Sequence, residues 1–269
     1  MQLAVTTWNI NSVRLRAESV GRFLREARPD VLCLQETKCP NDAFPLKTLQ
    51  AFGYPHVVFA GQKGYNGVAI LSRFSLHRTE SFRFCDRDDA RHITARLGPD
   101  AGKAAGITIH DFYVPAGGDT PDPALNPKFA HKLQYLDDLR AWGGRKGRDP
   151  AILVGDLNVA PREHDVWSHR QLLDVVSHTP VETERLERLR NEAEWVDTAR
   201  HLTPEPEKIY TWWSYRSPDW ATANKGRRLD HAWVSSDLAG TVRDLTVARH
   251  VRGWDRPSDH APVTLTLEL

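Results

Sequence analysis

The sequence has few cysteines and no long apolar run. Its three cysteines, Cys33, Cys39 and Cys85, form no Cys-x-x-Cys pair, which argues against a zinc site built on cysteine and favours structural thiols. No apolar segment approaches the roughly 20 residues that cross a bilayer. Residues 1–5 lack the basic flank and apolar stretch of a signal peptide. We therefore expect a cytoplasmic protein without membrane contacts.

An excess of either charge is also absent. The 36 Lys and Arg residues nearly balance the 35 Asp and Glu residues, for a net charge of +1. This balance argues against a globally basic coat for nucleic acid, but it leaves room for a local basic face. Basic segments occur at residues 145–148 and 225–228 and around 249–256. Each one alone is typical of a solvated loop, unless it lies beside a catalytic mouth.

Apolar runs of strand length recur along the 269 residues, of which 40% are hydrophobic. They alternate with helical patterns at residues 16–28, 128–142 and 181–193, and this alternation predicts an α/β layered fold. No linker interrupts the pattern, so we expect one domain over residues 1–269. The strand-like runs lie at residues 3–8, 31–34, 57–59, 68–71, 93–97, 107–114, 151–154, 229–234 and 263–267.

Polar signatures follow several of these apolar runs. Each places a carboxylate, amide or imidazole where a buried strand leaves its sheet. Their recurrence along the chain indicates a metal-assisted active site. The signatures are Trp8-Asn9-Ile10-Asn11, Gln35-Glu36, Gly155-Asp156-Leu157-Asn158, Arg228-Leu229-Asp230-His231 and Ser258-Asp259-His260.

The oxygen donors in these signatures suit a hard cation. Carboxylates and amides select Mg²⁺ or Mn²⁺ over zinc, and Glu36 is the natural ligand because it ends a buried strand in a polar tip. Asn9 and Asn11 alternate with Ile10, so both are able to face one side of an extended segment. Asn11 alone is equally typical of a turn. Asp259 is a further ligand, directly or through water.

The remaining groups match the hydrolysis of a phosphate ester. We expect Asp156 to polarise the attacking water and Asn158 to donate to a non-bridging oxygen. His260 is suited to donate to the phosphate, with its charge held by a carboxylate from elsewhere, such as Asp230. Tyr113 ends another apolar run, where a phenol would contact phosphate. Taken alone, such a tyrosine is more typical of a core aromatic.

Taken together, these stretches resemble the exonuclease III class of apurinic/apyrimidinic (AP) endonucleases, in the endonuclease/exonuclease/phosphatase superfamily with the DNase I-like fold. The matching segments run in family order over nearly the whole chain. They are Trp8-Asn9-Ile10-Asn11-Ser12-Val13-Arg14, Leu34-Gln35-Glu36-Thr37-Lys38, Tyr65-Asn66-Gly67-Val68-Ala69-Ile70, Tyr113-Val114-Pro115, Gly155-Asp156-Leu157-Asn158, Arg228-Leu229-Asp230 and Ser258-Asp259-His260.

The resemblance implies a four-layered α/β/β/α sandwich of two packed mixed β-sheets flanked by helices, with the site at one edge between the sheets. It implies Mg²⁺, with Mn²⁺ as a substitute, bound principally by Glu36 with Asn9 and Asp259 close by. A second metal would involve Asp156, Asn158 and His260. The catalytic roles would fall to Tyr113, Asp156, Asn158, Asp230, Asp259 and His260.

The resemblance also implies how DNA is bound. Residues 210–216 resemble a family loop whose aromatic residue lines the pocket for an extruded abasic sugar. Trp212 is the candidate for that wall, with Leu229 opposite; a tryptophan packed under a loop is the alternative. The phosphate- and DNA-binding residues would be Asn11, Arg14, Asn66, Lys128, Trp212, Arg216, Arg227, Arg228 and Leu229.

Three positions depart from the family pattern. Ala116 stands where some relatives carry a polar amide, and Asp119 where some carry a basic residue. Arg227 replaces a bulky apolar residue of the sugar pocket. We therefore expect looser damage-specific binding, unless Lys128 or the basic segment at residues 225–228 compensates.

The sequence thus predicts a monomeric, Mg²⁺-dependent DNA repair phosphodiesterase. It would cut 5′ to abasic sites to leave a 3′-hydroxyl, degrade duplex DNA from its 3′ ends and clear blocked 3′ termini. Two alternatives remain. One is a phosphoesterase of the same fold that acts on inositol phosphates or phospholipid head groups, and the other is a non-catalytic DNA-binding module.

Overall fold

Two six-stranded sheets form the centre of the structure, a computed structural model that describes residues 1–143 and 150–269. The basic segment at residues 145–148 lies outside the described residues. The first sheet has the strand order β13-β14-β1-β2-β4-β3, and only β1 and β2 pair in parallel. Its strands are β1 (Gln2–Asn9), β2 (Val31–Gln35), β3 (His56–Ala60), β4 (Val68–Ser72), β13 (Val242–Val247) and β14 (Val263–Glu268).

The second sheet has the order β5-β6-β7-β8-β12-β9, with β7 and β8 parallel. A separate two-stranded ribbon pairs Trp212 with Arg227. The strands of the second sheet are β5 (Leu76–Glu80), β6 (His92–Leu97), β7 (Thr108–Tyr113), β8 (Ala151–Asp156), β9 (Trp195–Asp197) and β12 (Asp230–Ser235), and those of the ribbon are β10 (Trp212–Trp213) and β11 (Gly226–Arg227).

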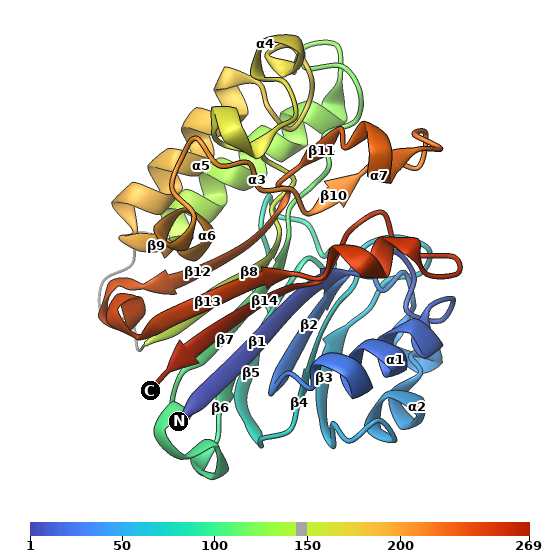
Figure 1. Ribbon diagram of the computed structural model, residues 1–269, viewed down its shortest axis with the longest axis vertical. Coiled ribbons are helices and arrows are strands. Elements are labelled where there is room, and N and C mark those ends of the chain that lie inside the picture. The colour runs from blue at the N-terminus through green and yellow to red at the C-terminus, as the bar shows by residue number, and fades with distance from the viewer. Residues whose placement is uncertain (144–149) are drawn as a thin grey trace.

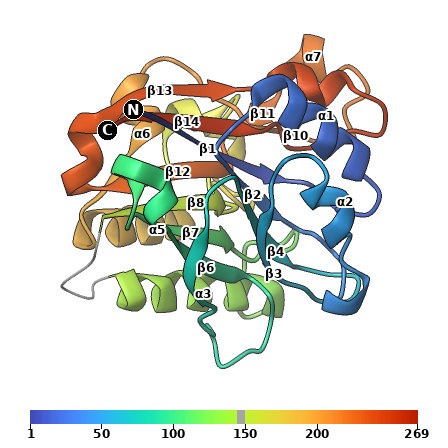
Figure 2. The ribbon, with the colours of Figure 1, turned by 90° about the horizontal axis from the view of Figure 1, so that it is seen from below.

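Helices cover the outer faces of both sheets (Figures 1 and 2). Residues of α1 and α2 pack on the first sheet, and residues of α3 and α5 pack on the second. This arrangement confirms the predicted four-layered sandwich. The α-helices are α1 (Ala17–Ala27), α2 (Leu46–Gln50), α3 (Pro127–Gly143), α4 (His169–Leu172), α5 (Pro180–Glu192), α6 (Thr198–Leu202) and α7 (Trp220–Ala223), and short 3₁₀ helices begin at Asn41, Pro99, Glu163, Ser236 and Arg249.

The alternation of side chains along each strand places the functional positions. On β1, Leu3 and Val5 belong to the core between the sheets, whereas Trp8 packs outward under the helices. Since side chains alternate, Asn9 falls on the same face as Val5. Side chains alternate in the same way on β8, so Asp156 falls on the same face as Val154, which belongs to this core. Both polar residues therefore reach the end of the inter-sheet core.

Several boundaries and edge elements differ from the sequence predictions. The expected helix at residues 181–193 begins at Pro180 instead, because Thr179 and Glu182 form a capping box. The expected strand at residues 229–234 begins at Asp230 and ends at Ser235. Strands β5 and β13 were not predicted, since their side chains are largely exposed and lack an apolar run. Among the described residues, no helix is long and apolar enough to cross a membrane.

Candidate active site

Five strand ends meet at one edge of the sandwich. Strands β1 and β2 of the first sheet deliver Asn9 and the residue after Gln35, while β7, β8 and β12 of the second deliver Tyr113, Asp156 and Asp230. The backbone turns sharply there, because Glu36 and Asn158 have left-handed φ angles of 50° and 53°. Such conformations are costly for residues other than glycine and concentrate at functional sites.

A buried acid–imidazole–acid arrangement lies at the centre of this edge. His260 Nδ1 lies 2.8 Å from Asp230 Oδ2, and His260 Nε2 lies 3.7 Å from Asp156 Oδ2. All three side chains are at most 5% exposed. We call Asp156, Asp230 and His260 the catalytic cluster, after the roles that the sequence predicts for them. One atom of each lies within 4.8 Å of the others, which is close enough for a shared cation.

Asn9 connects this cluster to Glu36. Its amide nitrogen donates to Glu36 Oε1 at 2.8 Å and to Asp156 Oδ2 at 2.9 Å. Asp259 faces the same space from the other side, where it accepts from Asn11 Nδ2 at 3.2 Å and from Trp212 Nε1 at 2.9 Å. The predicted metal ligands therefore share one hydrogen-bonded network with the predicted base.

The turn after β8 fixes Asn158 next to Asp156. The backbone N–H of Asn158 donates to Asp156 Oδ1 at 3.0 Å. Its side-chain amide donates to Val114 O at 2.8 Å and to Asp156 Oδ2 at 3.2 Å. Val114 follows Tyr113, so the bond to Val114 ties the two predicted phosphate-binding residues to one another.

Buried charge sets the protonation states of the cluster. Burial raises the pKa of Asp156 to about 7, although the charge of His260 opposes this rise. Burial disfavours the imidazolium of His260, but the carboxylates of Asp230 and Asp156 outweigh it and raise its pKa to about 10. Burial and the neighbouring Glu36 and Asp156 raise the pKa of Tyr113 well above its usual value. Around neutral pH, His260 is therefore charged, Tyr113 is protonated and Asp156 is close to its titration point.

Glu36 and Asp259 stay ionised in the same surroundings. Burial acts to raise the pKa of Glu36, but the Lys38 ammonium and the Asn9 amide hold it below its usual value. Burial likewise opposes ionisation of Asp259, and His260 and Trp212 reverse that effect. Two carboxylates are thus available as anionic ligands.

The structure adds two residues to which the sequence assigned no role. Lys38 Nζ lies 2.7 Å from Glu36 Oε2 and donates to Asn11 Oδ1 at 2.6 Å. Arg16 donates to Arg256 O at 2.8 Å and to Pro257 O at 3.1 Å, and so braces the segment before Asp259. Lys38 lies in one of the segments that carry the family resemblance, and this position could have identified it as a site residue. Arg16 gave no such signal, because the carbonyls of the segment that it braces are 240 and 241 residues away in the sequence.

The predicted DNA-binding residues divide into groups. Asn66 and Lys128 line one cleft of about 600 Å³ together with Tyr113 and Ala116. Trp212 packs near the buried Leu229, and the Arg227 guanidinium lies 5.2 Å from the centre of the Trp212 ring. The exposed side chains are Arg14, Arg216 and Lys128, as well as those of the departures Ala116 and Asp119, while Asn11 and Asn66 are half-buried.

The structure corrects the role that the sequence predicted for Arg228. Its side chain is only 1% exposed, and it forms buried ion pairs with Asp165 and Asp197 at 2.8 and 2.9 Å. A guanidinium enclosed in this way has no surface to offer DNA. The burial contradicts the predicted DNA contact of Arg228, which is a structural residue.

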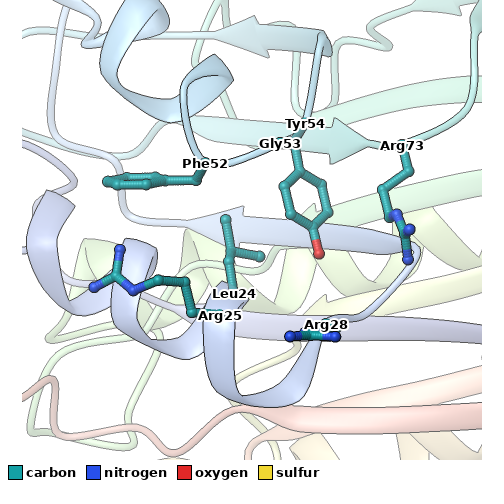
Figure 3. Close-up of a pocket in the computed structure, with 7 residues that line it drawn as sticks. All are labelled: Leu24, Arg25, Arg28, Phe52, Gly53, Tyr54 and Arg73. Carbon is teal, nitrogen blue, oxygen red and sulfur yellow. The ribbon is translucent and has the colours of Figure 1, made fainter.

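A second pocket, of about 420 Å³, lies between the end of α1 and the segments that follow α2 and β4 (Figure 3). Arg73 follows Ser72, which pairs with Val31, whereas Glu36 lies past the opposite end of β2. The length of this strand separates the pocket from the site by roughly 15 Å. The pocket is lined by Leu24, Arg25, Arg28, Phe52, Gly53, Tyr54 and Arg73.

Comparisons with known proteins agree with this architecture. The model of the Endonuclease/Exonuclease/phosphatase family matches residues 6–260. An AP endonuclease structure from Archaeoglobus fulgidus superposes with a TM-score of 0.90 at 33% identity, covering 99% of this chain and 100% of that one. The 3′ phosphatase NExo from Neisseria, bound to product DNA hairpin, superposes at 0.88 and 33% identity, covering 99% and 100%.

The fold and the site therefore define a phosphodiester hydrolase of the Endonuclease/Exonuclease/phosphatase family. Among curated proteins, exodeoxyribonuclease III of Haemophilus influenzae is 30% identical over 270 residues, which cover 96% of this chain and 97% of the relative. The chain belongs to the exonuclease III group of this family.

Proposed function

We propose that this protein is a DNA repair nuclease that cuts 5′ to abasic sites, removes nucleotides from 3′ ends and clears blocked 3′ termini. The hydrogen-bonded network that joins Glu36, Asn9, Asp156 and His260 at the end of the inter-sheet core carries the proposal. The relatives of this protein include an AP endonuclease, a 3′ phosphatase and an exodeoxyribonuclease III, which also supports the proposal. We propose that it acts as a cytoplasmic, single-domain monomer.

We propose Mg²⁺ as the cofactor, with Mn²⁺ as a substitute. Glu36 would hold it, with Asn9 and Asp259 close by, because these residues supply the oxygen donors that hard cations prefer. The ammonium of Lys38, 2.7 Å from Glu36 Oε2, supports the idea that this oxygen set accepts a cation. A second ion held by Asp156, Asn158 and His260 would require the neutral imidazole of His260, because both nitrogens of the imidazolium are donors. When bound, the metal neutralises charge on the phosphoryl oxygens and stabilises the leaving oxygen.

The side chains of the protein supply the remaining chemistry. Asp156 takes a proton from a water molecule, whose oxygen attacks the phosphorus and breaks the bond to the 3′-oxygen. His260, held by Asp230, donates to a non-bridging oxygen, as does the protonated phenol of Tyr113. Asn158 exchanges its longer bond, to Asp156 Oδ2 at 3.2 Å, for a bond to the phosphate. The 3′-oxygen leaves as an alkoxide and takes a proton from solvent water, so the products are a 3′-hydroxyl and a 5′-phosphate.

The aromatic wall at Trp212 is the proposed contact for the abasic sugar. The indole N–H of Trp212 donates to Asp259, and the guanidinium of Arg227 lies over the Trp212 ring. Leu229 packs nearby. An apolar wall accepts a sugar that lacks its base. Arg227 donates to Val176 O at 3.0 Å and to Ser177 Oγ at 2.8 Å, so it is fixed at the pocket and adds a positive charge there.

A labelled duplex with one central abasic analogue tests the proposal, with and without Mg²⁺ and beside an undamaged duplex. We expect metal-dependent incision at the analogue together with shortening of both duplexes from the 3′ end. A ladder from the 3′ end without internal incision would restrict the activity to an exonuclease. Absence of any cleavage, together with release of phosphate from inositol phosphates, would overturn the proposal.

A further inference from the structure

A fully buried lysine lies beneath the phosphate-binding side of the site. Lys132 is on the inner face of α3, beside the buried residues Phe129 and Leu136, and its side chain is 0% exposed. Its ammonium contacts Glu182 Oε1 at 2.5 Å, Asn158 O at 2.7 Å and Ala116 O at 3.4 Å. A helix of the outer layer thus reaches through to two loops of the active site.

Each of the two carbonyls belongs to a loop that presents a phosphate contact. Asn158 follows Asp156 in a left-handed turn, and Ala116 lies three residues after Tyr113. The loops also meet directly, through the bond from Asn158 Nδ2 to Val114 O. The ammonium therefore holds the backbone of both loops from the side of α3.

The surroundings leave Lys132 little freedom. A Cβ atom at Gly117 would lie 2.8 Å from Lys132 Cδ, so the loop approaches closely because that residue is glycine, with a φ of 89°. Glu182 is held in turn, since its carboxylate accepts from the backbone N–H of Ser177 at 3.0 and 2.9 Å and from Thr179 Oγ1 at 2.6 Å. The cation, its counter-ion and the loop are fixed together.

Stability alone does not explain this ion pair. A buried pair is often replaced by apolar side chains of similar volume with no loss, because desolvation offsets the attraction. Lys132, however, also satisfies backbone carbonyls that an apolar side chain would leave without a donor. The contacts to Asn158 and Ala116 are therefore the informative ones.

We infer that Lys132 is a positioning residue that sets the placement of Asn158 relative to Tyr113 for the phosphate group. The inference rests on the proposed function, because it assigns the phosphate to these two side chains. Small displacements of groups that contact the reacting atoms have large effects on rate, up to about a hundredfold for 1 Å. Lys132 acts through the loops and does not touch the substrate.

Two variants separate positioning from folding. Glu182→Gln removes the ion pair but keeps a capping residue at the same helix position. Burial then favours the neutral form of Lys132, since Glu182 no longer raises its pKa, and the amine still donates to Asn158 O. The double variant Lys132→Met with Glu182→Gln also removes the amine without leaving a buried unpaired carboxylate. We expect the double variant to lose about 10–100-fold in kcat relative to Glu182→Gln. We expect KM and the Mg²⁺ titration to stay within about threefold.

The same pair is then compared in an Asn158→Ala background, on the labelled abasic duplex and at a temperature where circular dichroism shows every variant folded. If Lys132 acts through Asn158, removal of the amine costs less than about threefold there. An equal loss in both backgrounds, or a lower Tm without any change in kcat, would overturn the inference. Absence of cleavage by the wild-type protein would refute the proposed function instead, so the two failures are distinguishable.

Discussion

Two buried groups of charges, each of which includes an aspartate from a strand of the second sheet, differ in how completely they are paired. The catalytic cluster of Asp156, Asp230 and His260 leaves Asp230 Oδ1 buried without a hydrogen-bond partner among the described residues. The other group, which we call the arginine cluster, contains Asp165, Asp197, Arg200 and Arg228. There Arg228 makes two bonds of 2.8 Å to the carboxylate of Asp165 and bonds of 3.0 and 2.9 Å to that of Asp197.

The pKa values move in opposite directions in the two clusters. Burial acts to raise the pKa of Asp165, but Arg228 and Arg200 lower it to about 2. In the catalytic cluster, burial prevails and the pKa of Asp156 is about 7. Asp165 faces two guanidinium groups and stays ionised throughout the physiological range, whereas Asp156 faces one imidazolium together with the carboxylates of Asp230 and Glu36 and lies close to its titration point. A base poised in this way suits proton transfer near neutral pH.

The comparison of the two clusters predicts that Asp156→Asn has the largest effect on catalysis. We expect kcat to fall by about three orders of magnitude, because the amide cannot accept a proton from water. DNA binding should remain, and the Tm should not fall, since the folded protein already disfavours the charged form of Asp156. Gel-shift and melting measurements accompany the cleavage assay. A variant with near wild-type turnover would remove Asp156 from the role of base.

The reciprocal change is Arg228→Met in the arginine cluster. It leaves two buried carboxylates without their main partner, so we expect a loss of about 3–5 kcal/mol in the free energy of unfolding. The kcat of the folded fraction should stay within about threefold, because Arg228 does not face the substrate. Urea unfolding monitored by tryptophan fluorescence measures the loss. If the variant were stable but bound DNA more weakly, the predicted contact between Arg228 and DNA would be correct after all.

Glu36→Ala tests whether ionised carboxylates at the site serve a metal. We expect the Mg²⁺ concentration for half-maximal cleavage to rise at least about tenfold, because the principal oxygen ligand is lost. Asp165→Asn is the matched control, since it removes a buried carboxylate outside the site. An unchanged Mg²⁺ titration would exclude Glu36 from metal binding.

Acid titration gives the smallest expected effect. The folded pKa of Asp165, about 2, lies below the ordinary value of 3.8, so its ionisation stabilises the fold above that value. This contribution, about 2 kcal/mol from the linkage of pKa to stability, is lost as the pH falls through 3.8 toward 2. Unfolding of wild type and Arg228→Met at pH 5 and pH 2.5 measures it together with the contribution of Asp197, whose pKa Arg228 also lowers. A difference between the two proteins that is independent of pH would contradict the assigned pKa.

Local patterns account for what the sequence predicted correctly. The apolar runs at β1, β2 and β8 are buried on both faces, so each strand and the polar group at its end were recognisable. Edge strand β13 was missed because exposed polar residues interrupt its pattern. Arg228 was misassigned because its partners Asp165 and Asp197 are separated from it by 63 and 31 residues. A local sequence pattern cannot reveal ion pairs between residues that are so far apart in the sequence.

The pairing of the first and last strands has a consequence for biosynthesis. Strand β1 lies between β14 and β2, and Gln2 pairs with Glu268. Contacts at such sequence separation form late and slow the folding of a chain. A nascent chain still lacking β14 exposes one edge of β1 and does not yet hold His260 in place. We therefore expect the hydrolytic centre to assemble only after residues 260–268 have been synthesised, and a chain cut before His260 to carry no nuclease activity.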